Sequence, residues 1–184
     1  TWLGHATVLI QIDGKNVLVD PCLIWNPNSF FAKRLVVSPI AIKQLPRIDV
    51  LLITHNHKDH LDKRALLNIV SDQISRFNKT PRFFVPSGLN SWLRKEIGIE
   101  ANEIAWWNEY RSGELLIAAT PAQHWSYRDL KINRSHWCGW VVKIDNHCVY
   151  VTGDTGYQNY QSSGIGNCQD FKKIKRKYGP VDLA

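Results

Sequence analysis

Alternating and continuous apolar stretches along the chain predict a protein built mainly from β-strands. Stretches of high β-propensity at residues 7–12 and 15–20 flank Asp13-Gly14, a pair typical of a tight hairpin. The continuous apolar run at 50–54 is typical of a strand covered on both faces. Further strands are predicted at residues 82–85, 104–107, 115–120, 140–144 and 148–152.

Three other segments carry apolar residues at helical spacing. Asp62 can cap the first helix, whose apolar face is formed by Ala65, Leu66, Ile69, Val70 and Ile74. A second helix is predicted at 90–97 and a third at about 168–178, where the basic run 172–177 forms the outer face. Residues 21–46 hold four prolines and predict a long irregular connection.

The mixed order of strands and helices favours an α/β or α+β fold. We expect residues 1–184 to form one domain that is incomplete at both ends. The chain opens on TWLGHATVLIQI without a methionine and closes on GPVDLA, which reads as the start of another strand.

The composition is that of an ordinary globular protein, with 44% hydrophobic and 21% charged residues. Four cysteines without a CxxC pair favour a reducing, cytoplasmic location. The formal charge of +7 is compatible with a solvated basic surface or with an anionic partner. The basic helix at 172–177 also allows peripheral contact with the inner membrane surface.

The stretch THNHKDHLD at residues 54–62 places three histidines and two aspartates directly after a predicted buried strand. In an extended segment alternate side chains point the same way, so His55 and His57 can bind one metal ion. Asp59 and His60 then face a second position beside it. We interpret this pattern as a metal-binding loop. The alternative, a solvated polar loop that binds nothing, is disfavoured because this combination of residues rarely arises by chance.

Two later residues follow predicted strands and can complete the sites. His124 comes after the strand at 115–120, and Asp154 lies between glycines after the strand at 148–152. Either residue alone could equally be a surface residue. Taken together, the expected set is His55, His57 and His124 for one ion, and Asp59, His60 and a bridging Asp154 for the other.

The order of these motifs resembles the metallo-β-lactamase superfamily, in which HxHxDH, a lone histidine and a GD at a strand end recur. The segments WLGHATVLIQIDG, HNHKDHLD, TPAQHWSYR and GDTGY are similar to the branch of N-acyl-phosphatidylethanolamine-hydrolysing phospholipases D. The resemblance implies a four-layered αβ/βα sandwich with the metals at one edge of its two sheets. It also implies one further metal-binding histidine, beyond the strand that GPVDLA begins.

The resemblance further implies a reaction. All six donors offer nitrogen or oxygen, which suits two Zn²⁺ ions without excluding Fe or Mn. A hydroxide bridging the metals would attack a phosphodiester of N-acyl-phosphatidylethanolamine or a related phospholipid, a role in lipid metabolism. The candidate catalytic residues are Asp59, His60 and Asp154.

Three more residues are candidates for contacts to the metal ligands or to substrate. His5 in LGHAT has this role or is a buried structural histidine, with neither favoured. Asp20 resembles an aspartate that supports the metal loop. His136 interrupts an aromatic, strand-like segment, which favours a structural role.

Two rival functions stay open. The superfamily also hosts hydrolases of lactones, thioesters and nucleic-acid phosphodiesters, and a fold does not determine its reaction. A truncated relative could instead bind metal without catalysis. Nucleic acid is the less favoured partner, and the oligomeric state is unknown from the sequence.

Overall fold

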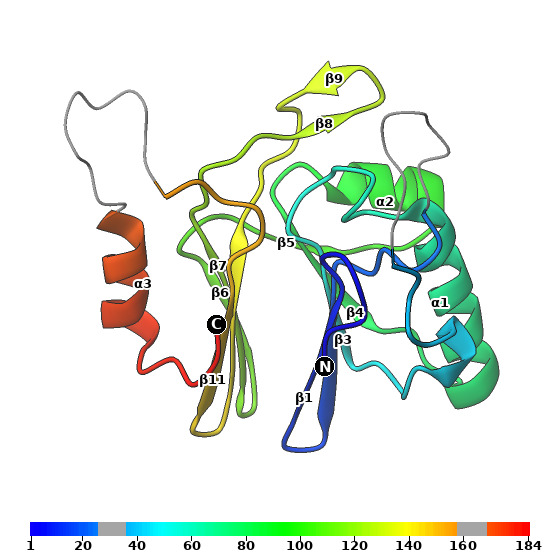
Figure 1. Ribbon diagram of the computed structural model, residues 1–184, viewed down its shortest axis with the longest axis horizontal. Helices are drawn as coiled ribbons and strands as arrows, with labels where there is room; N and C mark the ends of the chain where they lie inside the picture. Colours follow the sequence, from blue (N-terminus) through cyan, green and yellow to red (C-terminus); the bar gives the residue numbers. More distant parts are fainter. Residues whose placement is uncertain (26–35, 158–168) are drawn as a thin grey trace.

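Two β-sheets lie face to face in the computed structural model, which describes residues 1–25, 36–157 and 169–184 (Figure 1). The first sheet has the strand order β1-β2-β3-β4-β5. Its strands are β1 (Val8–Ile12), β2 (Lys15–Val19), β3 (Val50–Leu52), β4 (Arg82–Pro86) and β5 (Asn102–Ile104). The first pair is antiparallel, whereas β2 to β5 run parallel to one another.

The second sheet is antiparallel, with the order β11-β10-β7-β6. Its strands are β6 (Glu109–Ser112), β7 (Leu115–Thr120), β10 (Gly139–Ile144) and β11 (His147–Val151). A small hairpin of β8 (Tyr127–Arg128) and β9 (Lys131–Ile132) projects beyond the sheets at the top of Figure 1.

Helices cover the outer faces of both sheets, which gives four layers (Figure 1). The first sheet is covered by α1 (Lys63–Phe77) and α2 (Asn90–Ile97), and the second by α3 (Gln169–Tyr178). A short 3-10 helix, η1 (Ile42–Gln44), packs near α1. The αβ/βα sandwich implied by the resemblance is therefore confirmed.

Local chemistry explains several element boundaries. The β1–β2 hairpin turns at Asp13 and Gly14, which adopt φ of 47° and 72°, as a type I′ turn requires. The Asp62 side chain accepts a hydrogen bond from the Ala65 amide at 3.1 Å and so begins α1. Gly98, with φ 76°, ends α2 in a left-handed cap. These predicted features are confirmed.

An extensive apolar cluster lies between the sheets. It includes Val17, Val50, Phe84, Ile117 and Trp140, all fully buried or nearly so. Burial of such side chains contributes about 1.5–3 kcal/mol each. The packing of the two sheets therefore sets the relative position of the loops that leave their edges.

The buried face of α1 differs from the prediction. Ile74 is 48% exposed, whereas Gln73 is fully buried. The Gln73 side chain accepts a hydrogen bond from the Ile48 amide and donates one to the Pro46 carbonyl. Because both ends of the amide group are satisfied, a polar residue can occupy this apolar face.

Other predictions were wrong in detail. The strand expected at 104–107 is Asn102–Ile104, so Trp106 and Trp107 lie outside it. By contrast, the end of the chain agrees with the expected start of a strand, since Leu183 forms a parallel bridge with Val149 and its carbonyl accepts a hydrogen bond from the Tyr150 amide at 2.8 Å. Within the described part of the 21–46 connection, η1 is the one regular element, and residues 26–35 lie outside the description. None of the described helices has the length and apolar character needed to span a membrane.

Candidate metal centre

The predicted donors lie at one edge of the sandwich, in segments that follow strand ends. Residues 53–62 follow β3, His124 follows β7 and Asp154 follows β11. Although these segments are far apart in sequence, the structure brings all six predicted donors into one cluster. The positions of these side chains therefore agree with the predicted donor set.

Three histidines form the first donor group. His55 Nε2 lies 2.9 Å from His57 Nδ1, and His124 Nε2 lies 3.2 Å from each of these atoms. Nitrogen atoms that bind a tetrahedral Zn²⁺ at 2.0–2.1 Å are separated by about 3.3 Å. The three nitrogen atoms therefore fit one cation after a shift of a few tenths of an ångström.

Asp154 lies between this group and a second one. Its Oδ2 atom is 3.6 Å from His124 Nε2 and 3.4 Å from His60 Nε2. His60 Nε2 is in turn 3.8 Å from Asp59 Oδ2. A carboxylate in this position can contact cations in both groups, as the sequence predicts for a bridging ligand.

The electrostatics of the three-histidine group favour metal binding. Burial, followed by the neighbouring histidines, lowers the pKa of His55 to about 2. Burial also lowers the pKa of His57 and of His124. All three imidazoles are therefore neutral near pH 7, and a neutral imidazole is the form that binds a metal.

His60 differs from these three in its surroundings. Burial alone would lower its pKa, but the carboxylates of Asp20 and Asp154 raise that pKa to about 10. The hydrogen bond to His60 lowers the pKa of Asp154 below its ordinary range. A cation that binds His60 Nε2 would therefore displace a proton.

Asp20 supports the second group from behind. Its Oδ2 atom lies 2.8 Å from His60 Nδ1, and its Oδ1 atom accepts a hydrogen bond from the Thr54 amide at 2.7 Å. The Thr54 hydroxyl contacts the same carboxylate and lies 2.9 Å from His55 Nδ1. Asp20 thus occupies the predicted supporting position. Thr54 was missed, because a threonine at a strand end carries no distinctive signal.

Hydrogen bonds to backbone carbonyls connect this loop to the second sheet. The Trp140 indole donates to the Ile53 carbonyl at 3.0 Å, and the Cys138 amide donates to the Thr54 carbonyl at 2.9 Å. Gly153, with φ 61°, approaches so closely that a Cβ there would lie 3.1 Å from Thr54 and 2.9 Å from the Cys138 carbonyl oxygen. The glycine that precedes Asp154 is therefore required by packing.

His5 also reaches the cluster. Its Nε2 atom lies 2.9 Å from Asp59 Oδ2, and His5, Asp59 and His60 form a third set of donor atoms within 4.8 Å of one another. His5 adopts φ 48°, a conformation that is uncommon for residues other than glycine. His136 is not part of this cluster, since its ring contacts Trp106 and Trp137.

Arg128 was not predicted, yet it holds the loop from the other side. Its Nη1 atom donates to the carbonyls of Asn56 at 3.0 Å and Leu61 at 2.9 Å. The Asn56 side chain accepts a hydrogen bond from the Tyr127 amide at 2.8 Å. The donor loop is therefore fixed by the β8–β9 hairpin as well as by the two sheets.

A partly apolar cleft of about 450 Å³ opens beside the donors. Its lining includes His57 and Asp59 together with Trp125, Tyr127 and Leu130. A substrate with an apolar part and a polar group near the donors matches this arrangement.

The chain is similar to proteins whose names describe hydrolases. The family described as beta-lactamase superfamily domain matches residues 15–184. N-acyl-phosphatidylethanolamine-hydrolyzing phospholipase D 1 of Caenorhabditis elegans is 34% identical over 199 residues, covering 100% of this chain and 51% of that protein. The chain thus spans about half the length of this relative.

Two solved structures share the fold. A metallo hydrolase from Ignicoccus hospitalis has a TM-score of 0.67 at 24% identity, over 97% of this chain and 65% of its own. A diiron β-hydroxylase from Streptomyces venezuelae has a TM-score of 0.69 at 25% identity, over 99% of this chain and 33% of its own. The second comparison shows that this fold can accompany a reaction other than hydrolysis.

Proposed function

The chain belongs to the beta-lactamase superfamily, and from that premise we propose that it is a metal-dependent hydrolase of the phospholipase D type. Its substrate is N-acyl-phosphatidylethanolamine or a related phosphodiester. The similarity to the phospholipase D of Caenorhabditis elegans supports this choice. The observation that carries it is the position of Asp154, whose carboxylate lies within 3.6 Å of both His124 and His60.

Two ions are proposed to bind here. His55, His57 and His124 would hold the first, Asp59 and His60 would contribute to the second, and Asp154 lies within reach of both groups. We assign Zn²⁺ to both positions, because the donors are imidazoles and carboxylates without a thiolate. Two such ions, when bound, activate water at neutral pH and polarise a phosphoryl oxygen.

The protein side chains provide orientation and proton transfer. The Asp20 carboxylate is hydrogen-bonded to Nδ1 of His60, so that Nε2 of His60 faces Asp154. Asp59 is hydrogen-bonded to His5 and is placed to accept the proton of the attacking water. The cleft beside His57 and Asp59 receives the substrate, with Trp125 and Tyr127 contacting its apolar part.

Metal content and substrate range test this proposal together. Elemental analysis of the purified chain should give two zinc ions, and N-acyl-phosphatidylethanolamine and an aryl phosphodiester should both be hydrolysed. Asp154→Asn should abolish turnover, whereas Asp145→Asn, the same change in an exposed hairpin turn, should not. Full activity in Asp154→Asn, or a preference for a lactone or thioester, would exclude the proposed reaction.

A further inference from the structure

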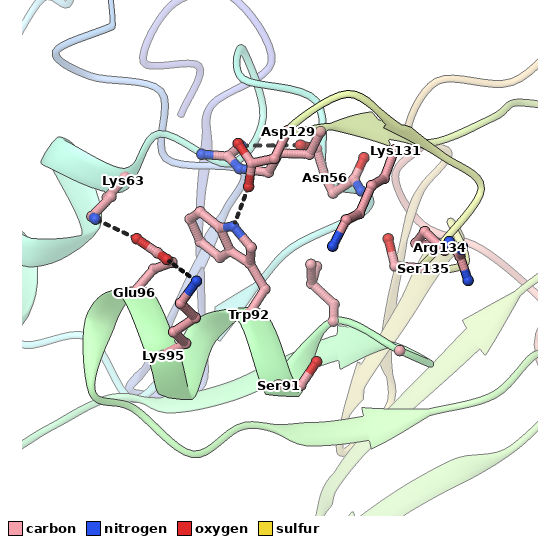
Figure 2. A pocket seen from close by; sticks show the side chains of 13 residues that line it. Asn56, Lys63, Ser91, Trp92, Lys95, Glu96, Asp129, Lys131, Arg134 and Ser135 are labelled. Carbon is pink, nitrogen blue, oxygen red and sulfur yellow. Dashed lines mark hydrogen bonds and ion pairs between the residues drawn. The ribbon is translucent and has the colours of Figure 1, made fainter.

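A second, larger cavity lies outside the donor cluster. It has a volume of about 1000 Å³, and none of the six proposed donors lines it. As Figure 2 shows, α2 forms one wall with Ser91, Trp92 and Lys95, and the segment after β8 forms the opposite wall. Lys131 extends into the space between Trp92 and Ser135.

The lining of this cavity is strongly basic. Five basic side chains face two acidic ones: Lys63, Lys95, Arg128, Lys131 and Arg134 against Glu96 and Asp129. Both acids are already engaged. Glu96 is 2.6 Å from Lys63 Nζ and 3.5 Å from Lys95 Nζ, and Asp129 accepts a hydrogen bond from the Trp92 indole at 3.1 Å.

Two of the cations have no counter-charge among the described residues. Lys131 and Arg134 form no ion pair with any residue in the described ranges. Charges of one sign inside a cavity create a potential that attracts the opposite charge. An anion is therefore the occupant that this lining favours.

The wall also holds two buried polar atoms that have no partner within the described ranges. Ser135 Oγ and Arg128 Nε have no hydrogen-bond partner in the part of the chain that is described. Ser135 is 3% exposed and Arg128 is 9% exposed. Leaving such groups unsatisfied costs about 1–3 kcal/mol each, so a native protein normally supplies a partner.

Arg128 is held rigidly in this position. Its guanidinium lies 4.1 Å from the centre of the Trp92 ring, and Nη1 binds two backbone carbonyls. The floor beside it is closely packed, since a Cβ on Gly88 would lie 2.9 Å from the Arg134 carbonyl oxygen. Fixed donors of this kind are suited to a ligand with several acceptor oxygens.

We propose that this cavity binds a phosphate group, carried either by a soluble phosphomonoester or by a lipid head group. Lys131 and Arg134 would neutralise its charge, and Ser135 and Arg128 would donate hydrogen bonds to its oxygens. The volume far exceeds a free phosphate, and Trp92 and Leu89 offer apolar contacts to the rest of the ligand. The proposal does not rest on the hydrolase function, although Arg128 also holds the donor loop.

Calorimetric titration with inorganic phosphate and with O-phosphoethanolamine tests the site. The double variant Lys131→Ala/Arg134→Ala should weaken binding about tenfold or more. A matched double variant, Lys15→Ala/Lys79→Ala, removes the same charge from exposed positions and should leave binding within about twofold. Equal losses in the two variants, or no loss in the first, would overturn the proposal.

Ser135→Ala separates ligand binding from folding. Since the hydroxyl has no partner within the described structure, its removal should leave the melting temperature unchanged or higher. Phosphate affinity should nevertheless fall about threefold to tenfold. A lower melting temperature with unchanged affinity would contradict the proposed role. Because this variant keeps the cavity wall, it remains informative if the charge variant folds poorly.

Vesicles distinguish the two sources of phosphate. Binding to phosphatidylcholine vesicles that contain phosphatidic acid, competed by inorganic phosphate and lost in Lys131→Ala/Arg134→Ala, would identify a lipid head group. Binding of O-phosphoethanolamine without vesicle binding would identify a soluble ligand. Binding in neither experiment would overturn the proposal, whatever the metal content or hydrolase activity of the chain.

Discussion

The Oδ2 atom of Asp20 lies 2.8 Å from Nδ1 of His60, and both side chains are buried. Asp20 adopts φ 43°, an uncommon backbone conformation for a residue with a side chain. The Thr54 amide and hydroxyl donate hydrogen bonds to the Asp20 carboxylate. The orientation of the His60 ring is therefore set by a residue from a different strand end.

Replacing Asp20 by asparagine should weaken metal binding at His60. The carboxylate makes the imidazole more basic and fixes its orientation, and loss of such a partner typically costs 10–100-fold in affinity. Competition with a chelator, followed by elemental analysis, measures the change. Asp13→Asn, in an exposed turn, is the control and should bind metal like the unmodified chain. Equal affinity in both variants would show that Asp20 has no influence on the metal.

The chelator-treated chain should lose stability as the pH falls below 6.5. His55 has a pKa of about 2 in the folded chain, against an ordinary 6.5, so the unfolded chain binds a proton that the folded chain does not. The free energy of unfolding then falls by up to about 1.4 kcal/mol per pH unit from this residue alone. Urea titrations at several pH values measure the slope. A curve that stays flat down to pH 5 would contradict the inferred environment of His55.

Gly153→Ala should destabilise the fold more than Gly113→Ala. Both glycines have a left-handed backbone, with φ of 61° and 57°, so the conformational cost is similar. At Gly153 the new Cβ would meet the Cys138 carbonyl oxygen at 2.9 Å, whereas at Gly113 no atom of the described residues lies within 4 Å. We expect an additional loss of about 1–3 kcal/mol for Gly153→Ala. Chemical denaturation of the two variants provides the comparison, and equal losses would rule out a steric role.

Asp62→Ala should destabilise the chain by about 2 kcal/mol or more. The Asp62 carboxylate accepts the Ala65 amide at the start of α1 and the amides of Ile24 and Trp25. Removing it leaves three backbone donors without this partner. Asp62→Asn keeps one side-chain oxygen. Its melting temperature should therefore lie between those of the parent chain and of Asp62→Ala. An alanine variant as stable as the parent would mean that water replaces these bonds.

Sequence patterns predicted those features whose physical causes are local. The Asp13-Gly14 turn and the Asp62 cap act over a few residues, and their chemistry is visible in the sequence. The six metal-type donors were also visible, because their residue types are uncommon in this order. Their convergence could be inferred only because each follows a predicted strand.

Features that depend on distant contacts could not be predicted in this way. Arg128 acts on carbonyls as far as 72 positions away, and Thr54 acts through Asp20, 34 positions away. Gln73 is buried because the 46–48 segment satisfies its amide group, which helical periodicity does not reveal. The two-residue strands β8 and β9 are too short for a periodic pattern.

The hydrogen bond from Trp140 to Ile53 joins residues 87 positions apart, just before the donor loop. Closing a contact of such sequence separation carries an entropic cost that slows folding. The loop reaches its final position only where the second sheet is packed on the first. The six donors are therefore brought together only in a chain whose two sheets have docked, and the rate of metal capture by a refolding chain should follow the rate of folding.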